Sequence, residues 1–233
     1  MKKFTLTIIL LYAFGSFAQD NTKVYGSFAS EMIFSFASIE NQDYDQGNIM
    51  RWAPVLNLQG MANFDFNEYF GLFTGAAVRN VGFIYEWPQA LDSNKTKYKY
   101  RTYNFGVPVG FKVGKLDKFL FFGGYEIEFP FVYKEKRFVN EEKEEKDVIW
   151  FSSRVEPVQH SLLAGIQFPY GAVLKFKYYL TNFHNRDYVA MVDGVEKKPY
   201  DFKSNIFYFS ICWNLFTNWK EYEPKNMKTS VVR

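Results

Sequence analysis

Apolar residues recur at every second position through most of this chain, and that alternation limits its fold more than any other feature. A period of two predicts β-strands whose two faces meet different surroundings, whereas an amphipathic helix shows a period near 3.6. Near the C-terminus, for example, Phe207, Phe209 and Ile211 alternate with Tyr208 and Ser210. We predict eight strands of this kind, at residues 25–37, 53–66, 69–84, 98–113, 118–134, 158–168, 172–181 and 205–216.

The connections between these strands alternate between short and long. The short ones are residues 67–68, 114–117 and 169–171, and the long ones are residues 38–52, 85–97, 135–157 and 182–204. Strict alternation places every long connection at the same end, as in barrels with short periplasmic turns and long extracellular loops. The sequence therefore predicts an all-β protein, a closed antiparallel transmembrane β-barrel of eight strands.

The aromatic content indicates which face of the barrel meets lipid. The chain holds 27 Phe, 17 Tyr and 5 Trp, yet its mean hydropathy is −0.26. Eight strands enclose room only for side chains or one small ligand, so the Phe-rich faces should point outward. The alternative is a soluble barrel that binds an apolar ligand. The rings also suggest two girdles. The first girdle, near the short turns, comprises Phe64, Phe66, Phe70, Phe111, Phe119, Phe168 and Trp213. The second, near the long loops, comprises Trp52, Phe83, Tyr85, Trp87, Tyr98, Tyr103, Tyr133, Tyr178 and Phe183.

The N-terminal residues 1–18 have the features of a secretory signal peptide. Lys2 and Lys3 precede an apolar stretch that is too short to span a bilayer, and Ser16-Phe17-Ala18 supplies a cleavage site. We therefore expect the barrel to occupy residues 19–216, followed by a periplasmic tail at residues 217–233. Removal of the two lysines leaves 26 basic residues against 25 acidic ones, which argues against nucleic-acid binding. The single cysteine excludes an internal disulfide.

With these features the chain resembles the small outer-membrane β-barrel family of Gram-negative bacteria, typified by outer membrane proteins X and A. Its strand spacing, Gly-rich inner faces and aromatic final strand are also similar to PorT-like β-barrels of Bacteroidota, as is Gln19 after the cleavage site. The resemblance covers residues 24–216. It implies a lipid bilayer with lipopolysaccharide, the barrel assembly machinery, and a protein partner at the extracellular loops or the C-terminal tail. It implies no cofactor.

Six charged residues fall on the polar, inward faces of the predicted strands. They are Glu31, Arg79, Glu126, Glu128, Lys175 and Lys177. Because a charge in a narrow lumen must be paired or hydrated, three acids and three bases predict a salt-bridge network that plugs the barrel. The alternative is a gate or a site for a small polar solute. The pairing of Arg79 with Glu126 or Glu128 is the central expectation.

Two of the long loops have distinct patterns. Residues 135–157 carry a run of Glu and Lys that predicts a solvated loop of mixed charge. In residues 182–204, Asp193-Gly194 predicts a tight turn between two short strands. A projecting hairpin here would offer Tyr188, Asp193, Gly194 and Tyr200 to a partner. Simple loop structure is the default interpretation, and two additional spanning strands, for a total of ten, are the other alternative.

No catalytic constellation or metal-ligand spacing emerges from the sequence. His184 has Asp187 and Asp201 nearby, which would suit an acyl-modifying enzyme, but no nucleophile motif accompanies it. We expect His184 to be a solvated loop residue and His160 to face lipid or an interface. The leading hypothesis is a non-enzymatic outer-membrane protein that acts through its extracellular loops in binding, adhesion or envelope integrity. The alternatives are a PorT-like subunit of a secretion or gliding complex, and a narrow channel or solute-binding barrel.

Overall fold

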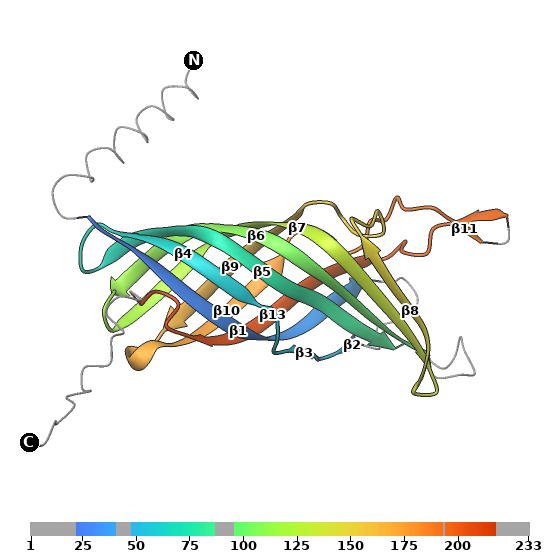
Figure 1. Ribbon diagram of the computed structural model, residues 1–233, viewed down its shortest axis with the longest axis horizontal. Coiled ribbons are helices and arrows are strands. Elements are labelled where there is room, and N and C mark those ends of the chain that lie inside the picture. The colour runs from blue at the N-terminus through green and yellow to red at the C-terminus, as the bar shows by residue number, and fades with distance from the viewer. Residues whose placement is uncertain (1–21, 41–47, 87–95, 193, 218–233) are drawn as a thin grey trace, which may run out of the picture.

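A computed structural model describes residues 22–40, 48–86, 96–192 and 194–217 of the 233-residue chain. The predicted signal peptide, Trp87, Asp193 and the tail beyond Thr217 lie outside the described residues. Across the described ranges, no helix is long and apolar enough to cross a membrane. Nearly all regular structure is β-strand (Figure 1).

Eight strands form a closed antiparallel ring, which confirms the predicted barrel. They are β1 (Lys23–Glu40), β4 (Leu58–Asp65), β5 (Phe70–Glu86), β6 (Thr96–Lys115), β7 (Phe119–Val139), β9 (Gln159–Gln167), β10 (Ala172–Tyr179) and β13 (Lys203–Trp213). Each pairs with the next in this order, and β13 pairs with β1 to close the ring. Where the eight strands overlap, closure leaves the ring without a free sheet edge.

The short and long connections separate to opposite ends of the barrel (Figure 1). Strands β11 (Ala190–Val192) and β12 (Val195–Lys197) form a separate two-stranded sheet at the long-connection end, so the ten-strand alternative is wrong. Much of the predicted solvated loop at residues 135–157 is exposed as expected, but it is regular β-structure and not a loop. There β7 continues to Val139 and pairs with β8 (Glu142–Trp150), so two strands of the wall project as a hairpin.

The second strand of the ring is interrupted, which corrects the predicted continuous strand at residues 53–66. It consists of β2 (Asn48–Ile49), β3 (Arg51–Ala53) and β4, with β2 paired to β5 and β3 paired to β1. Leu56 adopts a positive φ of 62°, and the Asn57 side chain turns inward, where its amide donates to the Ala53 carbonyl at 2.7 Å. The strand is therefore interrupted at Leu56 and Asn57, where the Asn57 side-chain amide turns into the interior.

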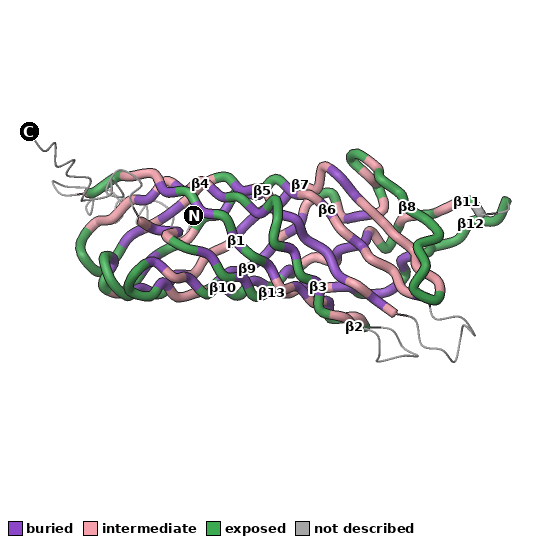
Figure 2. The backbone as a smooth tube through the Cα atoms, turned by 60° about the horizontal axis from the view of Figure 1, so that its bottom comes forward, coloured by how far each residue is buried: buried purple, intermediate pink, exposed green. Residues whose placement is uncertain are grey.

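The alternation of the sequence becomes an alternation of burial along much of the ring (Figure 2), although residues 79–83 of β5 are all buried. Around the middle of the barrel, small and polar residues point inward. Large apolar side chains cover the outside. Examples from five strands of the ring are Phe28, Phe105, Phe121, Phe176 and Phe209, of which Phe28 is 63% exposed. A charged centre of the interior beneath an exposed aromatic surface is the reverse of a soluble barrel.

The outer girdle near the long connections differs from the predicted one. Trp52, Tyr103 and Tyr178 do lie on the outside, but Phe83, Tyr85, Tyr133 and Phe183 are buried in the interior. Instead Phe131 and Trp150 extend the girdle, with ring centroids 6.3 Å apart, and Trp150 is 66% exposed. The pairing of β6 with β7 shifts at Tyr103/Asn104, and this irregularity moves Tyr133 to the inner face.

At the short-turn end the last strand stops earlier than the predicted residue 216. β13 ends at Trp213, Asn214 takes a positive φ of 55°, and the chain turns back. Leu215 and Phe216 are consequently buried, and the Phe216 ring packs against Phe122 with centroids 4.9 Å apart. The only cysteine, Cys212, also points inward, opposite Glu31 across the β1–β13 pairing. These residues close the bottom of the interior.

Candidate functional site

The six charged residues selected from the sequence all point into the barrel and lie together near its middle. Glu31 comes from β1, Arg79 from β5, Glu126 and Glu128 from β7, and Lys175 and Lys177 from β10. Each is at most 1% exposed. Positions two apart on one strand share a face, so the alternation that puts aromatic rings outside also puts these charges inside.

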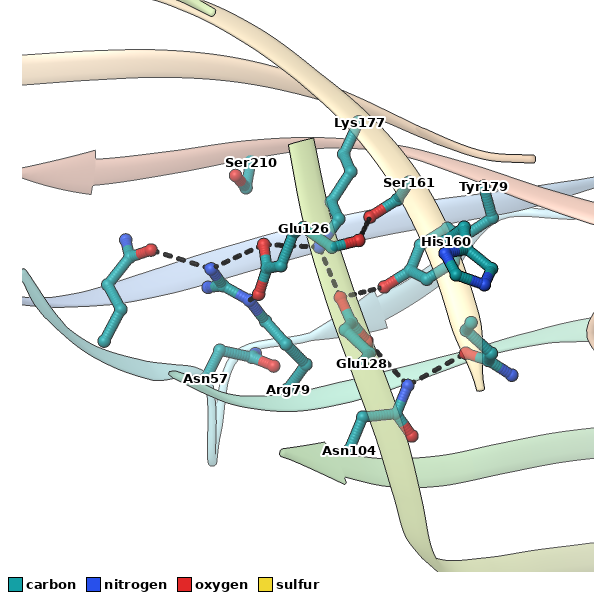
Figure 3. Close-up of polar contacts among 12 residues, drawn as sticks. Asn57, Arg79, Asn104, Glu126, Glu128, His160, Ser161, Lys177, Tyr179 and Ser210 are labelled. Carbon is teal, nitrogen blue, oxygen red and sulfur yellow. Dashed lines mark hydrogen bonds and ion pairs between the residues drawn. The ribbon is translucent and has the colours of Figure 1, made fainter. Parts of the chain in front are cut away.

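Arg79 is the central cation of this charge network. Its Nε and Nη2 donate to the two oxygens of Glu126 at 3.1 and 3.2 Å, a bidentate arrangement (Figure 3). Its Nη1 donates to Glu31, and its Nη2 also reaches Oε1 of Gln59 at 2.9 Å. The planar guanidinium thus joins two carboxylates from different strands, which a lysine ammonium cannot do with the same geometry.

Lys177 connects the second carboxylate of β7 to the network. Its Nζ lies 2.6 Å from Oε2 of Glu126 and also contacts Glu128 (Figure 3). The Tyr179 hydroxyl donates to Oε1 of Glu128 at 2.7 Å, and the Asn104 amide donates to Oε2 at 2.6 Å. Sequence analysis missed Tyr179 and Asn104, although both occupy inward positions of the alternation.

Lys175 completes the network on the side of β1. Its Nζ lies 2.6 Å from Oε2 of Glu31, which also accepts from the Ser210 hydroxyl at 2.7 Å. Three carboxylates therefore meet three cations, and the formal charge of the network is zero. Gly106 makes room for it, because a Cβ there would lie 2.3 Å from Oε1 of Glu126.

This arrangement suits a charged plug across the lumen better than a catalytic site. Each carboxylate accepts from at least two donors, so none is free to act as a base. Within the part of the chain that the structure describes, no three His, Cys, Asp or Glu side chains are grouped to hold a metal ion. Burial of a charge is costly unless it is paired and hydrogen-bonded, and here both conditions are met.

A cluster of aromatic rings fills the interior between the charge network and the long connections, and His184 lies at its centre. The imidazole stacks on Tyr200, with centroids 4.2 Å apart, and meets the edges of Tyr100 and Phe183. The expectation of a solvated His184 is wrong, because the residue is fully buried. Burial, assisted by the charge of Arg154, lowers the pKa of His184 to about 3. His184 is therefore neutral at physiological pH.

One carboxylate holds the top of this aromatic cluster together. The hydroxyls of Tyr133 and Tyr200 donate to Oε2 of Glu135 at 2.9 and 2.8 Å. Arg154 donates to the same oxygen at 3.2 Å and to Asp147 of β8 at 2.7 Å. The connection that carries Tyr200 is thereby fixed directly to β7, and Arg154 links the same carboxylate to β8.

The four residues proposed for partner binding do not form one surface. Tyr188 and Tyr200 pack together with centroids 5.9 Å apart, and Tyr200 is buried. Gly194 lies at the tip of the β11–β12 hairpin with φ of 76°, and a Cβ there would meet nothing within 4 Å. Asp193 lies outside the described residues. The arms of the hairpin are three residues each, shorter than the pattern suggested.

Below the charge network, Lys112 is a further buried cation that sequence analysis left out of the site. Its Nζ lies 2.5 Å from Oδ1 of Asp65 and donates to Asn63 at 3.1 Å. It also sits 5.2 Å from the centre of the Phe216 ring, a cation–π distance. The other histidine, His160, lies on the outer face beside Tyr125, with centroids 5.9 Å apart.

Comparison with known proteins gives weak similarities. No protein-family model and no curated protein matches the sequence. Among solved structures, Ail, the attachment invasion locus protein of Yersinia pestis in complex with the heparin analogue sucrose octasulfate, is 12% identical. The match covers 82% of this chain and 98% of that one, with a TM-score of 0.37. Neisserial surface protein A is 11% identical over 84% of this chain and 99% of its own, with a TM-score of 0.34.

Proposed function

We propose that this protein is a non-enzymatic outer-membrane barrel with a sealed lumen that acts through the β-structure at its long-connection end. The observation that carries this proposal is the inversion of the barrel, with paired charges inside and exposed aromatic and aliphatic side chains outside. A bilayer supplies the apolar surroundings that such a surface needs, and a closed ring satisfies every backbone group within it. The long connections then face the exterior and the short turns the periplasm.

Three layers of side chains support a lumen that does not conduct. The charge network around Arg79 crosses the middle. The aromatic cluster around His184 fills one end, and Phe73, Phe122 and Phe216 fill the other, with Phe73 and Phe216 centroids 5.1 Å apart. An eight-stranded barrel has no spare interior once its side chains fill it. The channel hypothesis therefore finds no support in the interior.

The projecting part of the wall supports an external binding role. Strands β6 and β7 continue past the outer girdle, and β8 pairs only with β7 among the described strands. Its other edge is therefore unpaired in this part of the chain, and it carries mostly Glu, Lys and Asp. Such a surface suits reversible recognition, either in adhesion and envelope support or as a subunit of a larger envelope complex.

Membrane placement is tested with the full chain expressed in a Gram-negative host. We expect the protein in the detergent-extracted envelope fraction, with a heat-dependent shift in gel mobility because the closed barrel resists unfolding in detergent. A protein that stays in solution without detergent and shows no shift would contradict the proposal. Planar-bilayer recording then tests the sealed lumen. We expect no unitary conductance from the wild type, and stable channels from it would overturn this part of the proposal.

The binding role is tested by replacing residues 137–145 with a short Gly-Ser turn, which joins the paired positions Lys136 and Lys146 and removes the tip of both arms. The barrel should still form, because the lower part of β7 pairs with β9 and not with β8. Partners captured from native envelopes by the wild type in mild detergent should be lost from this variant. Capture of the same proteins by both forms would show that the hairpin is not the binding element.

A further inference from the structure

Five cations line the outer face of β6, β7 and β8 just beyond the outer girdle. Arg101 of β6 pairs directly with Lys134 of β7. In the next row, farther from the girdle, Lys136 of β7 stands between Lys99 of β6 and Lys146 of β8. Arg101 and Lys99 lie two and four residues before Tyr103 in β6, so they share its outer face. The three lysines of β7 and β8 share that face through their cross-strand pairing. We call these five residues the cationic ladder.

Among the described residues, no ion pair joins any of the five cations to a carboxylate. Like charges directly opposite on a sheet repel and destabilise the pairing. Burial lowers the pKa of Lys99, and the charges of Arg51, Arg101 and Lys136 lower it further. The pKa of Lys136 is lowered by burial and by the neighbouring cations, first among them Arg101. The inner face of the same strands differs, because Glu135 and Asp147 there accept from Arg154.

The ladder begins directly at the aromatic girdle. The Tyr103 ring lies 6.5 Å from Phe131, and both Arg101 and Lys134 sit over it, at 5.7 and 4.9 Å from its centre. With about 3.3 Å per strand residue, the two rows of cations stand roughly 7 and 13 Å beyond Tyr103 along the strand. Below Tyr103, Phe105 is exposed on the outside. A ligand here meets apolar surface on one side and cations on the other.

We propose that the cationic ladder binds the phosphate groups of a phosphorylated lipid in the outer leaflet, with the acyl chains lying on the aromatic surface below. The proposal rests on the outer-membrane placement proposed above. Arginine and lysine give charge-assisted hydrogen bonds to phosphate, and the bound anion relieves the repulsion between the rows. Continuity of the ladder with the apolar belt selects a membrane lipid over a free anion, because only a lipid fills both surfaces.

The test uses the full chain folded in dodecyl maltoside and lipid A as the probe. Native mass spectrometry measures binding of bisphosphorylated lipid A and of the same lipid with both phosphates removed. We expect the wild type to prefer the phosphorylated form by at least about tenfold. The variant Lys99→Gln/Lys134→Gln/Lys136→Gln should lose that preference. The control Lys115→Gln/Lys118→Gln, with exposed lysines at the short-turn end, should keep it.

Failure of the proposed function and failure of the lipid site give different results in this experiment. Heat-dependent gel mobility is recorded for every form, so a wild type that does not fold as a barrel in detergent counts against the proposed function. A folded wild type with no preference between the two lipids overturns this inference alone. A triple variant that keeps the preference does the same. Complete competition by millimolar inorganic phosphate would assign the ladder to free anions and overturn the lipid site.

Discussion

The charge network inside the barrel and the cationic ladder outside it both use Arg and Lys side chains, but only the network contains carboxylates. Inside, every carboxylate of the network meets cations, and the formal charge cancels. Outside, five cations are stacked in register with no carboxylate bonded to them in the described ranges. The protein itself pairs the charges inside, whereas the cations outside are left in register for the lipid ligand proposed above. Four predictions test this contrast, from the largest expected effect to the smallest.

Arg79→Met should have the largest effect. It leaves Glu31 and Glu126 without their shared cation in a dry interior, so the free energy of unfolding should fall by about 3–5 kcal/mol. Urea unfolding of the folded barrel, followed by tryptophan fluorescence, measures the loss. The matched control is Arg101→Met in the ladder, where we expect a change within about 0.5 kcal/mol. Similar losses of unfolding free energy in both variants would show that the inner and outer charges contribute alike to stability.

The second prediction concerns the aromatic end of the interior and its response to pH. His184 has a pKa of about 3 when folded, against 6.5 when exposed, so only the unfolded chain takes up a proton between these values. The free energy of unfolding should therefore fall as pH falls, by about 2 kcal/mol from pH 7 to pH 5. Above pH 7 the contribution is constant.

His184→Phe isolates this effect, because a phenyl ring fills the same space and does not titrate. We expect the pH dependence of unfolding to be flatter in the variant by about 2 kcal/mol over the same interval. Parallel curves for the two proteins would mean that His184 takes up its proton as readily in the folded state as in the unfolded one.

Lys136→Glu should stabilise the protein. The new carboxylate would stand opposite Lys99 and Lys146, which turns two repulsive cross-strand pairs into attractive ones. We expect a gain of about 0.2–1 kcal/mol in the free energy of unfolding. Lys115→Glu serves as the control, since Lys115 is paired with Phe119 and not with a charge. A loss of stability in Lys136→Glu would show that the ladder is not strained by its own charge.

The smallest effect is expected at an exposed ion pair. Lys203 Nζ lies 2.6 Å from Glu40 Oε2, close to the Lys177–Glu126 distance, but its side chain is 53% exposed. Solvent screens such a pair, so Lys203→Gln should cost less than about 0.5 kcal/mol. A double-mutant cycle with Glu40→Gln gives the coupling energy, and a value near that of the buried pairs would contradict the importance of burial.

Sequence patterns predicted the barrel and its charged interior well, because an apolar exterior and a narrow lumen place opposite chemistry at alternate positions. That alternation fixes the strands and the inward placement of all six charges. It does not extend to the projecting part of the wall. The run Glu142–Trp150 forms β8 although its charged sequence predicted a loop, since a strand that is exposed along most of its length needs no apolar face.

Other differences depend on single backbone conformations. Alternation continues through Leu215, so nothing in the pattern shows that Asn214 turns the chain back at a φ of 55°. Similarly, one irregularity at Tyr103/Asn104 transfers Tyr133 from the girdle to the interior. The sequence did contain a signal for the β6 part of the ladder. Lys99 and Arg101 alternate with Tyr98, Tyr100 and Thr102, in the same way that apolar residues alternate with polar ones lower in the strand.

The position of Cys212 gives the protein a built-in reporter of assembly. The thiol is inside the wall and stands opposite Glu31 at the pairing of β13 with β1, where the last strand meets the first. A thiol-reactive reagent can reach it before the ends of the sheet join, and it becomes shielded once they do. Because Cys212 is the chain's single cysteine, the time course of its protection during refolding measures ring closure directly, with no engineered label.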